Sequence, residues 1–113
     1  MIAAVRKFFQ WIARPLSKLW DKPYSIQYHE DPIDNPKEKI LYVIGSSNEP
    51  WQVEMRCPCG CGEKIVLPVN EETTPCWSLQ IVDRNIPTLH PSIWRSKNCR
   101  SHFFLRNGKV IWA

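Results

Sequence analysis

The sequence predicts a mainly β fold, a small antiparallel sheet, preceded by one amphipathic N-terminal helix. Three observations support this fold class. Apolar residues among the first 20 positions recur in steps of three and four, as they do on one face of a helix. From residue 40 onward, short runs of alternating or β-branched apolar residues are separated by turn-forming residues, which is typical of strands. Cysteines also cluster beside two of these runs, as in small metal-stabilised domains.

The length of 113 residues favours one domain with an appendage. Its composition, 43% hydrophobic and 23% charged, is that of a folded chain and is too apolar for a disordered one. No apolar run reaches the roughly 18 residues that span a bilayer, and no cleavage site follows an apolar stretch. We therefore expect a cytoplasmic protein. The formal net charge of +4 belongs to the first 22 residues, unlike the even basic charge of many nucleic-acid binders.

Residues 1–20 are predicted to form the helix. Its apolar seam consists of Ile2, Val5, Phe9, Ile12, Leu16 and Leu19. Phe8 and Trp11 widen this seam, and Pro15 is expected to kink the helix because its ring removes a backbone donor. Such a helix packs on its own domain, lies on an anionic membrane surface or docks on a protein partner. We expect Phe8 and Trp11 to contribute to partner binding. A Pro-rich linker follows over residues 21–37.

Residues 38–113 are predicted to form the β domain. The expected strands are Ile40–Ile44, Trp51–Arg56, Ile65–Val69, Trp77–Val82, His102–Arg106 and Lys109–Trp112. The last two flank Asn107-Gly108, and Asn-Gly between two such runs is a strong hairpin signal because a type I′ turn needs positive φ at both positions.

The cysteines predict one structural zinc ion in a zinc-ribbon-like arrangement. The candidate ligands are Cys57, Cys59, Cys61, Cys99 and His102. Zinc takes about four such ligands, commonly two from each of two turns. The ends of the first cysteine cluster, with Cys99 and His102, form the favoured set, which leaves Cys59 as the spare thiol. Cys76 is expected to be a packed core thiol. Disulfides are disfavoured because the count of five is odd and the chain shows no secretion signal.

Two other uses of these residues stay open. A thiol could serve as a nucleophile, with Cys59 beside His102 or His90 as the only pairing, or an open zinc site could activate water near Glu54 or Glu63. Alternatively, the basic and aromatic residues of the last third could bind nucleic acid. Arg95 and Arg100 are the candidate contact residues for either a protein or a nucleic-acid partner.

Several separate motifs resemble those of a small bacterial family of unknown function. They are Arg56–Gly62, which contains Cys-Pro-Cys-Gly-Cys-Gly, then Thr88–Trp94, Cys99–Phe104 with its Cys-x-x-His-Phe sequence, and Gly108–Trp112. The resemblance covers about residues 50–113. It implies metal binding through Cys57, Cys59, Cys61, Cys99 and His102, and an association with bacterial cassettes that encode ubiquitin-like proteins and their conjugation enzymes. It also suggests that His90–Trp94 is a second important loop; the alternative is a Pro-rich loop that only packs Trp94 on the core.

These observations together favour a non-enzymatic adaptor that binds a protein partner, in the setting of a bacterial ubiquitin-like conjugation pathway. A nucleic-acid-binding zinc ribbon is the first alternative. A small zinc- or cysteine-dependent enzyme is the second. In the favoured interpretation the zinc ion joins the turn at residues 57–61 to the start of the C-terminal hairpin and so fixes a rigid binding surface.

Overall fold

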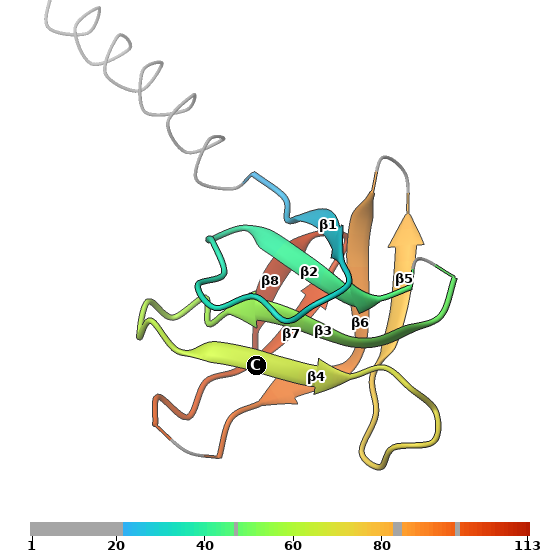
Figure 1. Cartoon of the computed structure of the whole chain (residues 1–113). Helices are drawn as coiled ribbons and strands as arrows, with labels where there is room; N and C mark the ends of the chain where they lie inside the picture. The colour runs from blue at the N-terminus through green and yellow to red at the C-terminus, as the bar shows by residue number, and fades with distance from the viewer. Residues whose placement is uncertain (1–21, 47, 83–84, 97) are drawn as a thin grey trace, which may run out of the picture.

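The computed structural model describes residues 22–46, 48–82, 85–96 and 98–113 (Figure 1). The predicted helix of residues 1–20 lies outside this part of the chain, together with Phe8 and Trp11. The described residues form strands and connections and contain no helix, so none of them offers a helix that could cross a membrane. The prediction of a mainly β fold is confirmed.

The strands form two four-stranded sheets in place of the single sheet that was expected. In chain order they are β1 (Ser25–His29), β2 (Ile40–Gly45), β3 (Pro50–Arg56), β4 (Lys64–Pro68), β5 (Ser78–Val82), β6 (Ile86–Trp94), β7 (His102–Arg106) and β8 (Lys109–Trp112). The first four make one sheet and the last four the other, each with its strands in chain order. Only β1 and β2 run parallel; the other neighbours are antiparallel.

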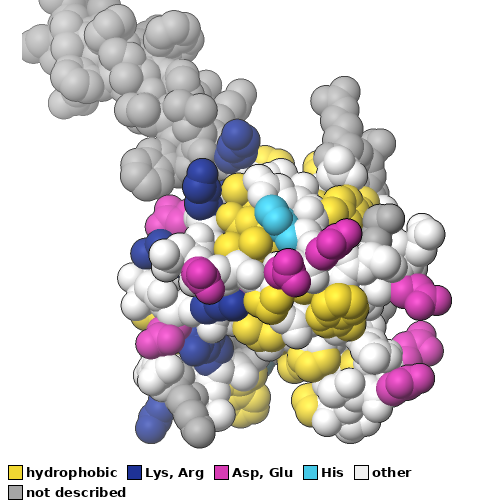
Figure 2. All heavy atoms as spheres, in the orientation of Figure 1, with side chains coloured by type: hydrophobic (Ala, Val, Ile, Leu, Met, Phe, Trp, Pro, Cys, Tyr) yellow, Lys and Arg dark blue, Asp and Glu magenta, His cyan; other side chains and the backbone are white. Residues whose placement is uncertain are grey.

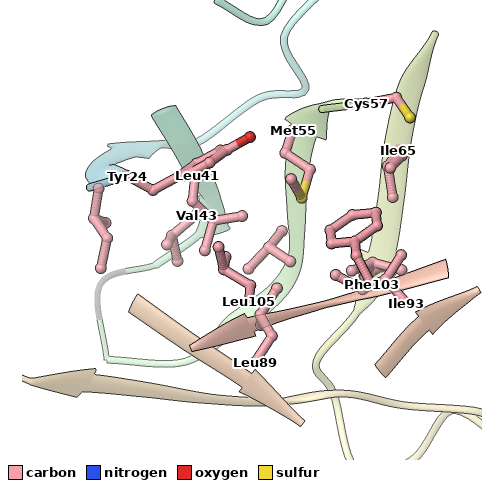
Figure 3. Close-up of a cluster of buried hydrophobic side chains, with 13 residues drawn as sticks. Tyr24, Leu41, Val43, Met55, Cys57, Ile65, Leu89, Ile93, Phe103 and Leu105 are labelled. Atoms are coloured by element: carbon pink, nitrogen blue, oxygen red, sulfur yellow. The ribbon is translucent and has the colours of Figure 1, made fainter. Parts of the chain in front are cut away.

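The two sheets pack face to face around one apolar core. Figure 3 shows Leu41, Val43 and Met55 of the first sheet directed toward Leu89 and Leu105 of the second. These five side chains are at most 1% exposed, and burial of each contributes about 1.5–3 kcal/mol to stability. Alternate residues of each strand face this core because successive side chains of a strand point to opposite sides. A second sheet is needed because either sheet alone would leave its apolar face in water.

The connection between β1 and β2 covers the outer face of the first sheet. Glu54 of β3 is fully buried there. It accepts a hydrogen bond from the Ile33 N–H at 2.9 Å and forms an ion pair with Lys64, whose Nζ lies 2.8 Å away. The Lys37 N–H donates to the Tyr42 hydroxyl at 3.0 Å. These contacts explain why every residue of β2 after Ile40 is buried. Strand β1 itself lies within residues 21–37, where an irregular linker was expected.

The Asn107-Gly108 turn joins β7 to β8 as the sequence predicts. Both residues have positive φ, 49° and 75°. The Gly108 N–H donates to the Pro87 carbonyl, and its own carbonyl accepts the Tyr24 N–H, each at 2.8 Å. A Cβ at Gly108 would lie 2.7 Å from the Cβ of Pro23, so only glycine fits this close approach. The turn therefore ties the start of the first sheet to the second.

Strand β6 includes His90–Trp94, which were expected to form a loop, and Trp94 is 72% exposed and so does not pack on the core. Two prolines, Pro87 and Pro91, disfavour a strand here because proline has no backbone N–H to donate. The strand tolerates them because its register shifts between Leu89 and Ile93, and because β5 pairs with β6 only as far as Ser78 opposite His90. Residues 90–92 thus form a bulge, beyond which one edge of β6 pairs with no described strand of its sheet.

Basic side chains are confined to one half of the face shown in Figure 2, where acidic side chains lie among them. Lysine and arginine side chains lie on the left half of this view, and the right edge carries acidic side chains over the β2–β3 and β4–β5 connections (Figures 1 and 2). The right edge of this face is therefore acidic.

Candidate functional site

Four cysteines from two connections meet at one end of the sandwich. Cys57, Cys59 and Cys61 come from the β3–β4 connection and Cys99 from the β6–β7 connection, and their sulfur atoms all lie within 4.8 Å of one another. Cys57 Sγ lies 3.4 Å from Cys59 Sγ and 3.6 Å from Cys99 Sγ. The β3–β4 connection turns back tightly, since the Cys57 N–H donates to the Glu63 carbonyl at 2.9 Å and Gly60 has φ 91°. This group could hold a metal ion.

The surroundings lower the pKa of the Cys59 and Cys99 thiols, whereas desolvation and the neighbouring thiols raise the pKa of Cys61 to about 11. The Ser101 hydroxyl lies 3.1 Å from Cys99 Sγ, and hydrogen bonds from the Ser101 side chain and backbone lower the pKa of Cys99 to about 6. The Cys61 N–H donates to Cys59 Sγ at 3.3 Å. Arg95 brings a positive charge, with its Nη1 3.9 Å from Cys61 Sγ. Deprotonated sulfur is the form that binds metal ions.

The group differs in two residues from the ligand set favoured from sequence. Cys59, expected to be spare, lies with the other three cysteines. His102, expected to complete the set, is not in the group; its Nε2 lies 2.9 Å from the Ser92 Oγ. Cys76, expected to be packed in the core, is exposed. Its place in the β4–β5 connection, before the first core-facing residue of β5, explains this difference.

Ser92 and His102 form a hydrogen-bonded pair on the outer face of the second sheet. The pair joins the β6 bulge to the first residue of β7. The His102 ring stacks on Trp94, with ring centroids 5.1 Å apart and planes inclined by 14°. Phe104 lies beside the imidazole at 6.2 Å. The two aromatic rings therefore fix the orientation of the imidazole while its Nε2 faces the serine.

The backbone of Ser92 is anchored separately. Trp77 Nε1 donates a hydrogen bond to the Ser92 carbonyl at 3.3 Å. The two residues are 15 positions apart, and Trp77 also packs against the core cluster. Because the Trp77 indole is held by the core, the bulge that presents Ser92 is held as well. Sequence reasoning missed Ser92 as a functional residue, although it lies in the Thr88–Trp94 motif; nothing in the spacing pairs it with His102.

A serine hydroxyl hydrogen bonded to an imidazole is the arrangement of nucleophile and general base in acyl-transfer enzymes. Within the described part of the chain, no carboxylate is hydrogen bonded to His102, so the pair is a dyad supported by aromatic rings. Of the other predicted contact residues, Arg95 is half-buried beside the cysteine group and Arg100 is exposed.

Comparison with known proteins identifies the family. No curated protein and no solved structure matches the chain. One family model, described as bacterial ubiquitination-like system serine protease (BubE), matches residues 27–113. This description supports the expected association with ubiquitin-like conjugation cassettes. It overturns the prediction of a non-enzymatic adaptor, which rested on the rarity of catalysis in small zinc domains, and it is closer to the small-enzyme alternative. Because the match covers well over half of the sequence, the chain belongs to the BubE family.

Proposed function

We propose that this protein is a serine protease of a bacterial ubiquitination-like system, with Ser92 as nucleophile and His102 as general base. The observation that carries the proposal is the hydrogen bond of 2.9 Å between Ser92 Oγ and His102 Nε2. This distance is within the range in which a base takes the proton of a nucleophile. The family description supports the same reaction class. The substrate we propose is a ubiquitin-like polypeptide of that system, or its conjugate.

The reaction follows from the two side chains. Ser92 Oγ attacks the carbonyl carbon of the scissile bond while His102 Nε2 accepts the hydroxyl proton, which gives a tetrahedral intermediate and an imidazolium ion. His102 then returns the proton to the leaving amine, and an acyl ester remains on Ser92. Water, deprotonated by the same imidazole, attacks this ester and releases the carboxylate product and free Ser92.

Trp94 supplies part of the support that a carboxylate gives in a triad. Its ring lies against His102 with near-parallel planes, so it limits rotation of the imidazole. When His102 becomes positively charged, the π face of the indole also attracts it, an interaction of about 0.5–2 kcal/mol. This attraction is stronger in the charged intermediate than in the resting state, and it therefore favours catalysis.

The cysteine group is proposed to hold one structural zinc ion. A tetrahedral ion with zinc–sulfur bonds of about 2.3 Å places its four sulfurs about 3.8 Å apart. The distances of 3.4 and 3.6 Å from Cys57 Sγ to Cys59 and Cys99 fit this set of ligands. Four thiolates leave no open position for water, which is the pattern of structural sites. Since Cys99 lies three residues before His102, the ion would hold the start of β7 and with it the base.

Hydrolysis of p-nitrophenyl acetate tests the dyad, because this small ester needs a nucleophile and a base but no extended binding site. We expect Ser92→Ala and His102→Ala to reduce the rate to the uncatalysed background. Ser96→Ala is the matched control, since Ser96 is an exposed serine four residues farther along the chain, and it should keep the wild-type rate. Equal rates for Ser92→Ala and the wild type would contradict the proposal.

A further inference from the structure

A cavity of about 770 Å³ opens between the two sheets at the end where β1, β2, β5 and β6 come together. Its lining is mainly apolar and includes Tyr28, Val43, Leu79 and Ile81. Tyr28 and Ile81 are 46% and 45% exposed although they are large apolar side chains. They are exposed because the core stops short of this end, and the cavity is the space that it leaves. A pocket of this size and lining is typical of a ligand or substrate site.

The wall of this cavity is continuous with the backbone of the proposed nucleophile. Pro91 lines the cavity and directly precedes Ser92, and Trp77 both lines the cavity and donates its Nε1 hydrogen bond to the Ser92 carbonyl. His90, two residues before Ser92, lines it too. The cavity and the dyad therefore meet at the β6 bulge, with the cavity between the sheets and the Ser92–His102 pair on the outer face.

The free edge of β6 provides a path for such a polypeptide. The Arg95 N–H donates to the Ser101 carbonyl, toward β7, and the hydrogen-bonding groups of a strand alternate between its two sides. The N–H and C=O of Trp94 accordingly face the other side, where β5 no longer pairs with β6. An extended segment placed along this edge gains backbone hydrogen bonds, as in β-strand addition. At Ser92 this edge is covered by the Trp77 indole, whose Nε1 donates to the Ser92 carbonyl, so the segment leaves the edge there and continues over Pro91 to the cavity.

The charge around the cavity further limits which side chains of a substrate would bind there. Among the described residues that line the cavity, Glu71 is the only acidic one and none is a lysine or an arginine. The β4–β5 connection that contributes Glu71 lies at the acidic right edge of Figure 2. An apolar side chain fits the interior, and a basic side chain next to it in the same segment complements Glu71 at the mouth.

We infer that this cavity is the substrate-binding subsite of the enzyme and that it holds an apolar residue of an extended substrate segment, with a basic neighbour facing Glu71. The inference rests on the proposed serine protease function. It assigns specificity to a different set of residues from the dyad, so the two can be tested separately.

The test compares peptide cleavage with ester hydrolysis. The peptide probe is a library of internally quenched peptides that varies apolar, acidic and basic residues around the cleavage position. Ile81→Trp fills the cavity, and Gln80→Trp is the matched control because the neighbouring side chain points to the opposite face of β5. We expect the wild type to prefer peptides with a large apolar residue beside a basic one. Ile81→Trp should lower kcat/KM for these peptides at least about tenfold, the effect of a lost apolar pocket, mainly through KM.

Gln80→Trp should cleave the preferred peptides like the wild type, and both variants should hydrolyse p-nitrophenyl acetate at the wild-type rate. Glu71→Lys, an exposed substitution in a connection, should shift the preference from a basic to an acidic neighbour. Unchanged peptide kinetics in Ile81→Trp overturn the subsite, as does a wild type that hydrolyses the ester but shows no apolar preference or cleaves no peptide. A wild type that fails to hydrolyse even the ester overturns the proposed function itself.

Discussion

Removal of one cysteine of the group is expected to destabilise the whole domain, because the proposed zinc ion joins parts of the chain that are far apart in sequence. Cys57 and Cys99 lie 42 positions apart and belong to connections of different sheets. The substitution Cys99→Ala removes the only ligand that the second sheet contributes. The three cysteines that remain all belong to the β3–β4 connection and cannot join the two sheets through a metal ion.

The size of the effect follows from the loop that the ion closes. Cross-linking two positions 42 residues apart reduces the entropy of the unfolded chain by an amount worth about 4 kcal/mol at 25 °C. Domains of this size are stable by about 5–15 kcal/mol in total. A loss of about 4 kcal/mol corresponds to a melting temperature lower by about 15–30 °C. The zinc–sulfur bonds themselves add to this loss, so it is a lower limit.

The assay is thermal unfolding followed by circular dichroism, with the zinc content of each sample measured by mass spectrometry. Cys76→Ala is the control, since Cys76 is exposed and lies outside the group. We expect the control to bind one zinc ion per chain and to keep the wild-type melting temperature. Cys99→Ala should lose the zinc ion and unfold at a lower temperature. If Cys99→Ala had the same melting temperature as the control, the reasoning would be refuted, because the cross-link would then contribute nothing to stability.

Three further substitutions test other contacts. Trp94→Ala should lower kcat for ester hydrolysis about 2- to 30-fold, and Trp94→Phe should restore much of the rate. The urea midpoint of unfolding should not change, since Trp94 is 72% exposed. An unchanged rate in Trp94→Ala would exclude the stacking role. Glu54→Ala should destabilise the fold in urea by about 1–3 kcal/mol, because the Ile33 N–H and Lys64 lose their partner, whereas the exposed Glu63→Ala should not. Burial raises the pKa of Tyr24 to about 12, so the folded state keeps its proton where the unfolded state has lost it, and stability should fall between about pH 10 and 12. Tyr24→Phe should show a smaller fall over that range, and an identical pH profile would contradict the assignment.

Much of the fold could be predicted because local patterns determine it. The alternating runs gave most of the strands nearly to the residue, and Asn107-Gly108 fixed the last hairpin because few other residues adopt positive φ there. Strand β1 was not predictable from the Pro-rich segment, since it forms only through parallel pairing with β2, which is a long-range contact. Strand β6 was obscured by its prolines, which a bulge and an open edge accommodate.

The site was predictable only in part. Cysteine is rarely used for anything but metal, redox or core packing, so the close spacing of three cysteines pointed to the group that the structure shows. The spacing Cys99-x-x-His102 also suggested a shared metal site, but β7 begins at His102 and directs its side chain to the outer face of the sheet, away from that group. The Ser92–His102 pair depends on the shifted register of β6, which no local pattern encodes. Serine is too common a residue to be singled out without this geometry.

The most direct test of the central claim is the mass of the protein after treatment with a fluorophosphonate, which reacts with activated serines, followed by sequencing of the modified peptide. We predict one adduct per chain, located on Ser92, and its loss in His102→Ala, because the hydroxyl at 2.9 Å from Nε2 depends on this base for activation. An adduct on another serine, or an unmodified wild type beside a fully labelled serine protease in the same solution, would contradict the assignment of Ser92 and His102 as the catalytic pair.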